Sequence, residues 1–434
     1  MKHLNFILLF CIAFYTSVFA QNNIRPTLCH IAFATDNFAD TPYRLSIKGD
    51  IVGELPKFKT YELISFEGQW AKVRYMGTEC YIARNRVETV DKPEFVCSPW
   101  VRNWFSYKYP YIGLVGEWEG VADDWTKPLT REEAAEIIIN DFFGRIYSAW
   151  EMKHVLKPAV KTGGNRLITD SNGGNEHKLA VWGIVPPGKF NPKGKITYQE
   201  ITSWFIKLIS YNIKYMREGA GKALTKEDFA KFGIGGDTKL NALCTKEQLM
   251  VLCDKVFLWY SDQEFKKQSN YKVEDCQDGC NIVNTGVYYI KTYLGNKPNQ
   301  PYLIVNNRGT VELSNSKKQK YKITFIKHSL NYDSNLMKIY TIQTMDGKYV
   351  GIPGITVSGK NATIQNNEFL WEISSGISED YQFTNTITDP NNIHQVLNAS
   401  GWNLSDNTPI ISWYWNLGTG TDNNNCKFIF VKLE

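Results

Sequence analysis

A helix start with the same chemistry occurs three times in the middle of this chain. The three stretches are L-T-R-E-E-A-A-E-I-I-I-N-D-F-F from Leu129, I-T-Y-Q-E-I-T-S-W-F from Ile196 and C-T-K-E-Q-L-M-V-L-C from Cys244. In each stretch a Thr is followed three residues later by Glu or Gln, which is a capping box that satisfies backbone amides at a helix N-terminus. The pairs are Thr130/Glu133, Thr197/Glu200 and Thr245/Gln248. An apolar run follows each pair, so we expect three similar helices, and repetition organises the centre of the chain.

A glycine and a loop precede each of these helix starts. The second copy reads V-W-G-I-V-P-P-G-K-F-N-P-K-G-K-I-T-Y-Q-E. A Gly-Ile-Val, a loop with Phe-x-Pro and a Thr-capped helix resemble the S-layer homology repeat, for which three copies are usual. The resemblance covers residues 100–262 and implies a central all-α bundle of three repeats.

In the S-layer homology family, the residues just after the capping Thr line grooves that hold an anionic cell-wall polysaccharide. Helix N-termini suit this role because they offer unpaired amides and partial positive charge. Carried over by position, the wall-polymer-binding residues would be Thr130 and Arg131, Thr197 and Tyr198, and Thr245 and Lys246. Tyr198 and Lys246 depart from the Thr-Arg pair of the family. The alternative is a helical scaffold in which Arg131 is simply solvated.

The two ends of the N-terminal region have different characters. Residues 1–20 have a short basic start, an apolar stretch and a small residue at Ala20, which is typical of a secretory signal peptide cleaved before Gln21. Residues 29–92 alternate apolar and polar positions, which predicts short strands. Gly68, Trp70, Val73, Gly77 and Tyr81 in this region resemble the pattern of the bacterial SH3-like barrel, which implies cell-wall peptide as a ligand. The alternative is a spacer barrel with Trp70 in its core.

Residues 282–434 are rich in Asn, Thr, Tyr and Trp and divide into three units of short strands. Three units of about four strands each are what a threefold β-trefoil needs to close its barrel. The arrangement resembles the ricin-type lectin trefoil, with Trp371 at the closing aromatic and Phe325 and Phe430 in its place elsewhere. The expected fold class is therefore multidomain α+β, with a small N-terminal β-barrel, a central all-α bundle and a C-terminal β-trefoil.

The third trefoil unit contains the residues that the lectin resemblance places around a sugar. They are Asn398 on an early strand, Trp413 and Trp415 in I-I-S-W-Y-W-N, and Asn424 or Asn425 near the last strand. An indole face with a few fixed amides is the minimum that such a pocket uses. The alternative is that one Trp packs in the core and the other is exposed incidentally.

Charge and composition exclude several functions. The net charge is +5, from 49 basic and 44 acidic residues with no Lys/Arg block, so a nucleic-acid partner is not expected. No Cys/His spacing resembles a metal site, no cofactor motif occurs, and no later segment is apolar enough to span a membrane. Eight cysteines remain after residue 20, and an oxidising compartment permits disulfides between them.

Acidic pairs such as Glu132 and Glu133 lie at helix starts, where capping explains them better than catalysis. We therefore expect a secreted protein of the cell surface or periplasm that binds glycan or wall polysaccharide, with peptidoglycan peptide as a further partner, and has no catalytic residues. A protein-interaction scaffold that has lost sugar binding is the alternative. A wall-active hydrolase ranks third.

Overall fold

The computed structural model describes most of the chain, in segments. The described residues are 24, 27–31, 41–55, 59–90, 96–109, 124–146, 167–171, 174–215, 223–269, 283–293, 300–330, 336–354, 358–377, 383–390, 392–403, 405–414 and 424–433. The predicted signal peptide, residues 1–20, lies outside them. By their contacts the residues form two compact units, one of residues 1–41 and 56–264 and the other of residues 42–55 and 265–434.

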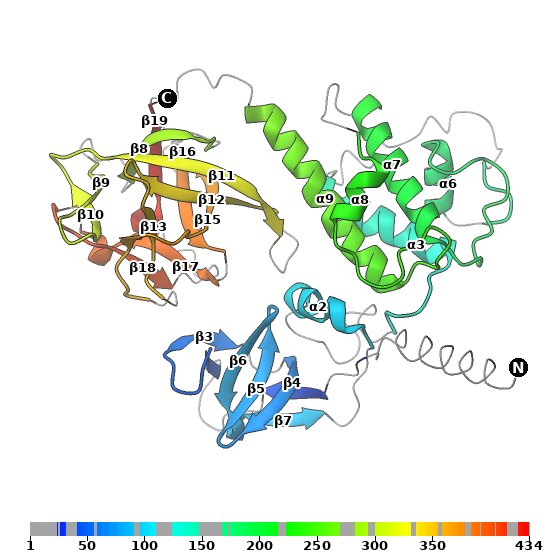
Figure 1. The fold of residues 1–434 in the computed structure, drawn as a ribbon, viewed down its shortest axis with the longest axis horizontal. Coiled ribbons are helices and arrows are strands. Elements are labelled where there is room, and N and C mark those ends of the chain that lie inside the picture. Colours follow the sequence, from blue (N-terminus) through cyan, green and yellow to red (C-terminus); the bar gives the residue numbers. More distant parts are fainter. Residues whose placement is uncertain are drawn as a thin grey trace, which may run out of the picture. The chain divides into compact units, whose positions relative to one another are not determined.

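The first unit combines a small sheet with helices. Its strands, drawn in blue in Figure 1, are β1 (Thr27–Ile31), β4 (Thr60–Glu67), β5 (Trp70–Tyr75), β6 (Thr78–Ala83) and β7 (Val87–Val90). The short helix η1 (Arg84–Arg86) lies between β6 and β7. The strands are hydrogen-bonded in the order β6-β5-β4-β1-β7. Gly77 has a φ of +75° at the turn between β5 and β6, where the sequence predicted a turn.

A buried ion pair ties this sheet to the first helix. Arg74 on β5 donates from Nε to Glu62 on β4 at 3.0 Å, and it also donates to Asn103 Oδ1 at 2.9 Å. Arg102 binds the second oxygen of Glu62, which is 2% exposed. Two cations therefore neutralise one buried carboxylate, as burial of a charge requires.

The helices of the first unit differ widely in length. They are η2 (Pro99–Val101), α2 (Arg102–Lys108), α3 (Arg131–Ile137), η3 (Ile138–Phe143), α4 (Gly144–Ile146), α6 (Gly174–Val181), α7 (Tyr198–Tyr215), α8 (Lys226–Lys231) and α9 (Lys246–Ser269, of which residues 246–264 belong to this unit). Trp125 is 1% exposed and belongs to one core cluster with Leu28, Phe105 and Met250. The N-terminal strands and the helices thus contribute to a common core.

The predicted fold class is wrong in its central part. Strands account for 41% of the structure and helices for 28%, and within the described ranges there is no central all-α bundle. Extended segments enter the Thr-capped helices and pair with one another in the antiparallel bridges Pro128↔Thr245, Thr130↔Lys195 and Thr197↔Leu243. These segments need backbone partners, which side-chain packing between helices cannot supply. Backbone pairing between these extended segments therefore holds the helices together, in addition to packing between the helices.

The second unit contains a closed barrel. The unit also includes β2 (Thr41–Arg44, of which residues 42–44 belong to it) and β3 (Ile51–Leu55), which are not strands of the barrel sheet. The strands of the barrel sheet are β8 (Gly286–Thr292), β9 (Tyr302–Val305), β10 (Val311–Ser314), β11 (Lys320–Leu330), β12 (Leu336–Thr344), β13 (Tyr349–Gly351), β14 (Thr363–Gln365), β15 (Trp371–Ile377), β16 (Phe383–Asp389), β17 (Asn392–Ala399), β18 (Ile410–Tyr414) and β19 (Phe428–Lys432). The short helices are η4 (Ser400–Trp402) and η5 (Asn424–Cys426). Antiparallel pairing joins β8 to β11, β11 to β12, β12 to β15, β15 to β16, β16 to β19, and β19 back to β8.

This ring of six strands is a barrel, and three hairpins accompany it. The hairpins are β9–β10, β13–β14 and β17–β18, one for each sequence unit. Six barrel strands and three hairpins are the arrangement of a β-trefoil, and the yellow-to-red half of Figure 1 shows it. Closing the ring removes the exposed edges that an open sheet would present.

Aromatic side chains fill much of the barrel core. Trp371 and Phe430 are fully buried in its core cluster, whereas Phe325 is only partly buried against it. The indole of Trp371 donates to the carbonyl of Val350 at 2.8 Å, which satisfies its polar end inside the core. Two of the three closing aromatics therefore pack centrally. Among the described residues, no helix is long and apolar enough to cross a membrane.

Candidate functional site

A closed ring of backbone hydrogen bonds joins the three segments that enter the capped helices. The amide of Leu129 donates to the carbonyl of Cys244 at 2.9 Å, and the amide of Cys244 donates to the carbonyl of Ile196 at 2.9 Å. The amide of Ile196 completes the ring by donating to the carbonyl of Leu129 at 3.0 Å. Each of these residues immediately precedes a capping Thr. The ring therefore brings the three helix starts together.

All three predicted capping boxes are present at this ring. The amides of Thr130, Thr197 and Thr245 donate to the side chains of Glu133, Glu200 and Gln248 at 2.7, 3.0 and 3.0 Å. The Thr hydroxyls accept from the amides of those same partners at 3.2, 3.2 and 3.4 Å. Capping consumes the Thr side chains, so Thr130, Thr197 and Thr245 act within the fold.

The first amide of each helix is also engaged. Those of Arg131, Tyr198 and Lys246 donate to the carbonyls of Gly194, Ala242 and Lys127 at 2.9, 2.8 and 3.3 Å. A helix N-terminus binds an anion through such amides when they have no other partner. Here loop carbonyls occupy them, so any wall polymer at these positions would be recognised by side chains.

Arg131 is not solvated. Its Nε and Nη2 donate to Glu200 Oε1 at 3.0 and 2.6 Å. Burial acts to raise the pKa of Glu200, but hydrogen bonds from Thr197 and Arg131 outweigh it and lower that pKa. At the third helix start, Lys246 Nζ lies 5.4 Å from the ring centroid of Trp125. The three predicted positions therefore have three different environments.

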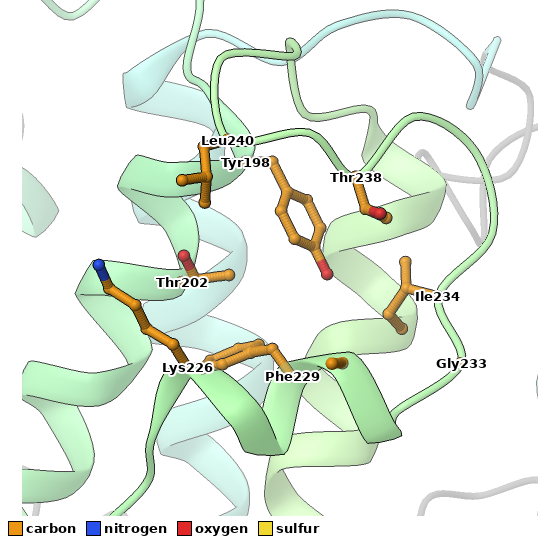
Figure 2. Close-up of a pocket in the computed structure, with 9 residues that line it drawn as sticks. Tyr198, Thr202, Lys226, Phe229, Gly233, Ile234, Thr238 and Leu240 are labelled. Atoms are coloured by element: carbon orange, nitrogen blue, oxygen red, sulfur yellow. The ribbon is translucent and has the colours of Figure 1, made fainter.

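Tyr198 lines a pocket of about 230 Å³ in the first unit. Figure 2 shows its ring reaching from α7 toward Thr238 and Ile234, with Phe229 of α8 on the opposite side. Burial raises the pKa of Tyr198 to about 12, so its hydroxyl stays protonated at neutral pH and can donate and accept hydrogen bonds. Two aromatic rings and the hydroxyls of Thr202 and Thr238 give the pocket both apolar and polar walls. Sequence reasoning identified Tyr198 but missed the rest.

In the trefoil, two of the predicted sugar-site residues meet, but inside the protein. Asn398 and Asn425 are 3% and 4% exposed. Asn425 Nδ2 donates to Asn398 Oδ1 at 3.0 Å and to the carbonyl of Ala399 at 3.3 Å. Asn398 Nδ2 lies 3.0 Å from Cys426 Sγ, its acceptor. Asn425 Oδ1 is buried without a partner among the described residues.

Trp413 is 49% exposed on β18, so it is not a core residue. It pairs with Val396 of β17, and Ile411 pairs with Asn398. An isolated antiparallel bridge joins Asn361 to Ile411. Because directly opposed residues point to the same face of a sheet, Asn361, Ile411 and Trp413 share one face with Asn398. We name the first three of these the Trp413 face.

Asn361 is exposed and belongs to the second sequence unit, which is why sequence reasoning did not join it to the third. Trp415 lies outside the described residues. The backbone of Asn424 is in η5, but its side chain also lies outside the described part. No group of three or more His, Cys, Asp or Glu in the described ranges could hold a metal ion.

Comparison with known proteins adds little beyond this geometry. No family model matches the sequence, and neither does any curated protein. Among solved structures, the agglutinin of Rhizoctonia solani is 20% identical and covers 35% of this chain and 98% of its own, with a TM-score of 0.27. The ricin B-like lectin of Macrolepiota procera, in complex with lactose, is 15% identical and covers 36% of this chain and 100% of its own, with a TM-score of 0.27. The designed threefold symmetric protein ThreeFoil is 13% identical and covers 34% of this chain and 99% of its own, with a TM-score of 0.25. At TM-scores this low, the likenesses carry no argument about a ligand.

Proposed function

We propose that this protein is a secreted, cell-envelope-associated carbohydrate-binding protein that performs no catalysis. Its C-terminal barrel recognises a saccharide on the Trp413 face. The observation that carries the proposal is the half-exposed indole of Trp413 on the same face as the exposed amide of Asn361.

The physical argument rests on how sugars are recognised. A pyranose ring presents an apolar face to an indole and hydroxyls to amides, which can both donate and accept. The Asn398–Asn425 pair holds β17, the strand that pairs with β18, to the segment before β19, so the strand that carries Trp413 is preorganised. When a sugar covers the exposed indole, apolar surface is removed from water. This stabilises the complex by roughly 25 cal/mol per Å² of buried apolar surface.

The central repeats supply a second binding surface in this proposal. The pocket at Tyr198 is proposed to take one sugar residue of a wall or surface polymer, because Tyr198 and Phe229 line it together with Thr238, whose hydroxyl can donate and accept. The SH3-like region of residues 29–92 is proposed to contribute contacts with wall peptide. Secretion, by removal of residues 1–20, would place these surfaces outside the cytoplasm.

A structural scaffold is a second candidate for the central repeats alone. The observation that favours it is the internal use of the helix starts, where Arg131 binds Glu200 and loop carbonyls take the first amides. In a scaffold these contacts serve only to hold the repeats together.

Two binding measurements on the mature chain test the proposal. The first is a glycan array with wild type, Trp413→Ala and the control Met345→Ala, which removes a 60% exposed apolar side chain of the same unit. We expect array binding by wild type and by the control, and its loss in Trp413→Ala. The second is sedimentation with purified cell-wall sacculi, comparing Tyr198→Phe with Tyr349→Phe. If the wild type bound neither glycans nor sacculi, the proposed binding function would be wrong and the structural scaffold would take its place.

A further inference from the structure

The first sequence unit of the barrel contains a cavity of about 670 Å³ that sequence reasoning missed. The end of β9 and the turn after it line one side, and Lys317, Lys318 and Gln319 line another. Asn407 contributes from the loop before β18. The cavity is thus formed by residues about 100 positions apart in the chain, which the barrel brings together.

The lining of this cavity is cationic. Arg308, Lys317 and Lys318 are exposed, and among the described residues no carboxylate lies within ion-pair distance of them. Glu312 is the one acidic residue of the lining, and its Oε2 accepts from Asn306 Nδ2 at 2.6 Å. Three positive groups therefore face one carboxylate that already has a partner. Such an excess favours an anionic ligand.

Two tyrosine rings restrain Lys318, one of the three cations that line the cavity. Lys318 Nζ lies 5.0 Å from the ring centroid of Tyr302 and 5.9 Å from that of Tyr289. Lys291 Nζ lies 5.1 Å from the Tyr302 centroid, and the two tyrosine rings are 5.7 Å apart. Cation–π contacts of this kind restrain ammonium groups that would otherwise sample many positions. The ammonium group of Lys318 is therefore restrained beside the cavity.

Amide side chains complete the lining. Gln319 Oε1 accepts from the amide of Val305 at 2.6 Å, which leaves its Nε2 as a donor. Asn307 and Asn407 are exposed at the cavity. Amides that donate and accept match sugar hydroxyls, whereas a bare phosphate or sulfate ion needs donors only. The combination of cations with amides therefore favours a sugar that carries a negative group.

We propose that this cavity binds an acidic saccharide, in which Arg308, Lys317 and Lys318 contact the carboxylate or sulfate and the amides contact hydroxyls. The site is separate from the Trp413 face and does not depend on the function proposed for it.

The test measures binding of the full mature chain, at low salt, to three polysaccharides of similar molecular mass. The probes are dextran sulfate, polygalacturonate and unsubstituted dextran. The variant is Lys317→Gln/Lys318→Gln, and the control is Lys322→Gln/Lys327→Gln, which removes the same charge from exposed lysines of β11. We expect wild type and control to bind one or both acidic polymers but not dextran. We expect the variant to bind about tenfold more weakly, because two charge-assisted contacts are lost.

Equal weakening in the variant and the control would overturn the proposal, since it would show only a diffuse charge effect. Binding of an oligo-dT strand more tightly than either polysaccharide, with the same loss in the variant, would also overturn it in favour of a nucleic-acid site. Trp413→Ala separates the two proposed sites, because it should leave binding of the acidic polymers unchanged.

Discussion

Arg131 of the first repeat binds the carboxylate that caps the helix of the second repeat. Its Nη2 donates to Glu200 Oε1 at 2.6 Å, while Glu200 Oε2 accepts from the amide of Thr197 at 3.0 Å. One glutamate therefore closes a capping box and an ion pair between repeats that lie 69 residues apart. This contact gives Arg131 a structural role that its position after a capping Thr did not reveal.

The Arg131–Glu200 pair predicts a pH-dependent contribution to stability. Glu200→Gln should keep the cap, because Gln248 serves the third helix in the same way, but it should weaken the ion pair. The pKa of Glu200 is lowered in the folded protein. Its contribution is therefore present above the ordinary pKa of a glutamate and is lost as pH falls from there through the lowered pKa of the folded protein.

The measurement is urea denaturation of both proteins, followed by helical circular dichroism. We expect Glu200→Gln to cost about 1 kcal/mol at neutral pH, the scale of a partly exposed ion pair, and almost nothing in acid. A cost that is the same at both pH values would contradict the assignment. Lys193→Gln, which removes the exposed Lys193–Glu132 pair, is the control.

The buried amide pair of the trefoil predicts a cost for removing Asn398. In Asn398→Ala the Nδ2 of Asn425 would lose one of its two acceptors, and a cavity would form beside Cys426. We expect a loss of about 1–3 kcal/mol in the free energy of unfolding of the barrel. Chemical denaturation measures it. A neutral result would mean that the pair does not hold β17 to the segment before β19.

The buried thiols should react slowly with alkylating reagents in the folded protein. The six cysteines in the described ranges, Cys29, Cys80, Cys97, Cys244, Cys253 and Cys426, are free and buried. Burial raises the pKa of Cys97 to about 12 and that of Cys244 to about 12. Because the thiolate is the reactive form, iodoacetamide at about pH 8 should label them only after unfolding. Peptide mapping by mass spectrometry checks each site, and rapid labelling or a disulfide at any of the six would contradict the structure.

Local chemistry was predictable from the sequence. The capping boxes involve residues three apart, so their side chains and amides meet whenever a helix forms. The barrel followed from three strand-rich units of similar length, and the burial of Trp371 and Phe430 agrees with their place as closing aromatics. Asn398 and Asn425 lie in contact, but both are buried, and their part in sugar binding stays a prediction.

Long-range pairing was not predictable. The ring of Leu129, Ile196 and Cys244 joins residues 48 to 115 positions apart. Because of these backbone hydrogen bonds, extended segments hold the helices of the central region together. Likewise, Asn361 reaches the Trp413 face only through its bridge to Ile411. Neither contact leaves a periodic signal in the sequence, because each depends on where separate units pair.

Sugar binding on the Trp413 face is tested most directly by calorimetric titration. The mature wild type, Trp413→Phe and Trp413→Ala are each titrated with the glycan that the wild type selects on the array. If the sugar stacks on the Trp413 face, Trp413→Phe should retain part of the affinity. Trp413→Ala should lose about tenfold, since aromatic stacking contributes roughly 0.5–1.5 kcal/mol beyond the area it buries and about 1.4 kcal/mol is tenfold in affinity. Equal affinity in wild type and Trp413→Ala would show that the exposed indole is incidental and that the saccharide binds elsewhere or not at all.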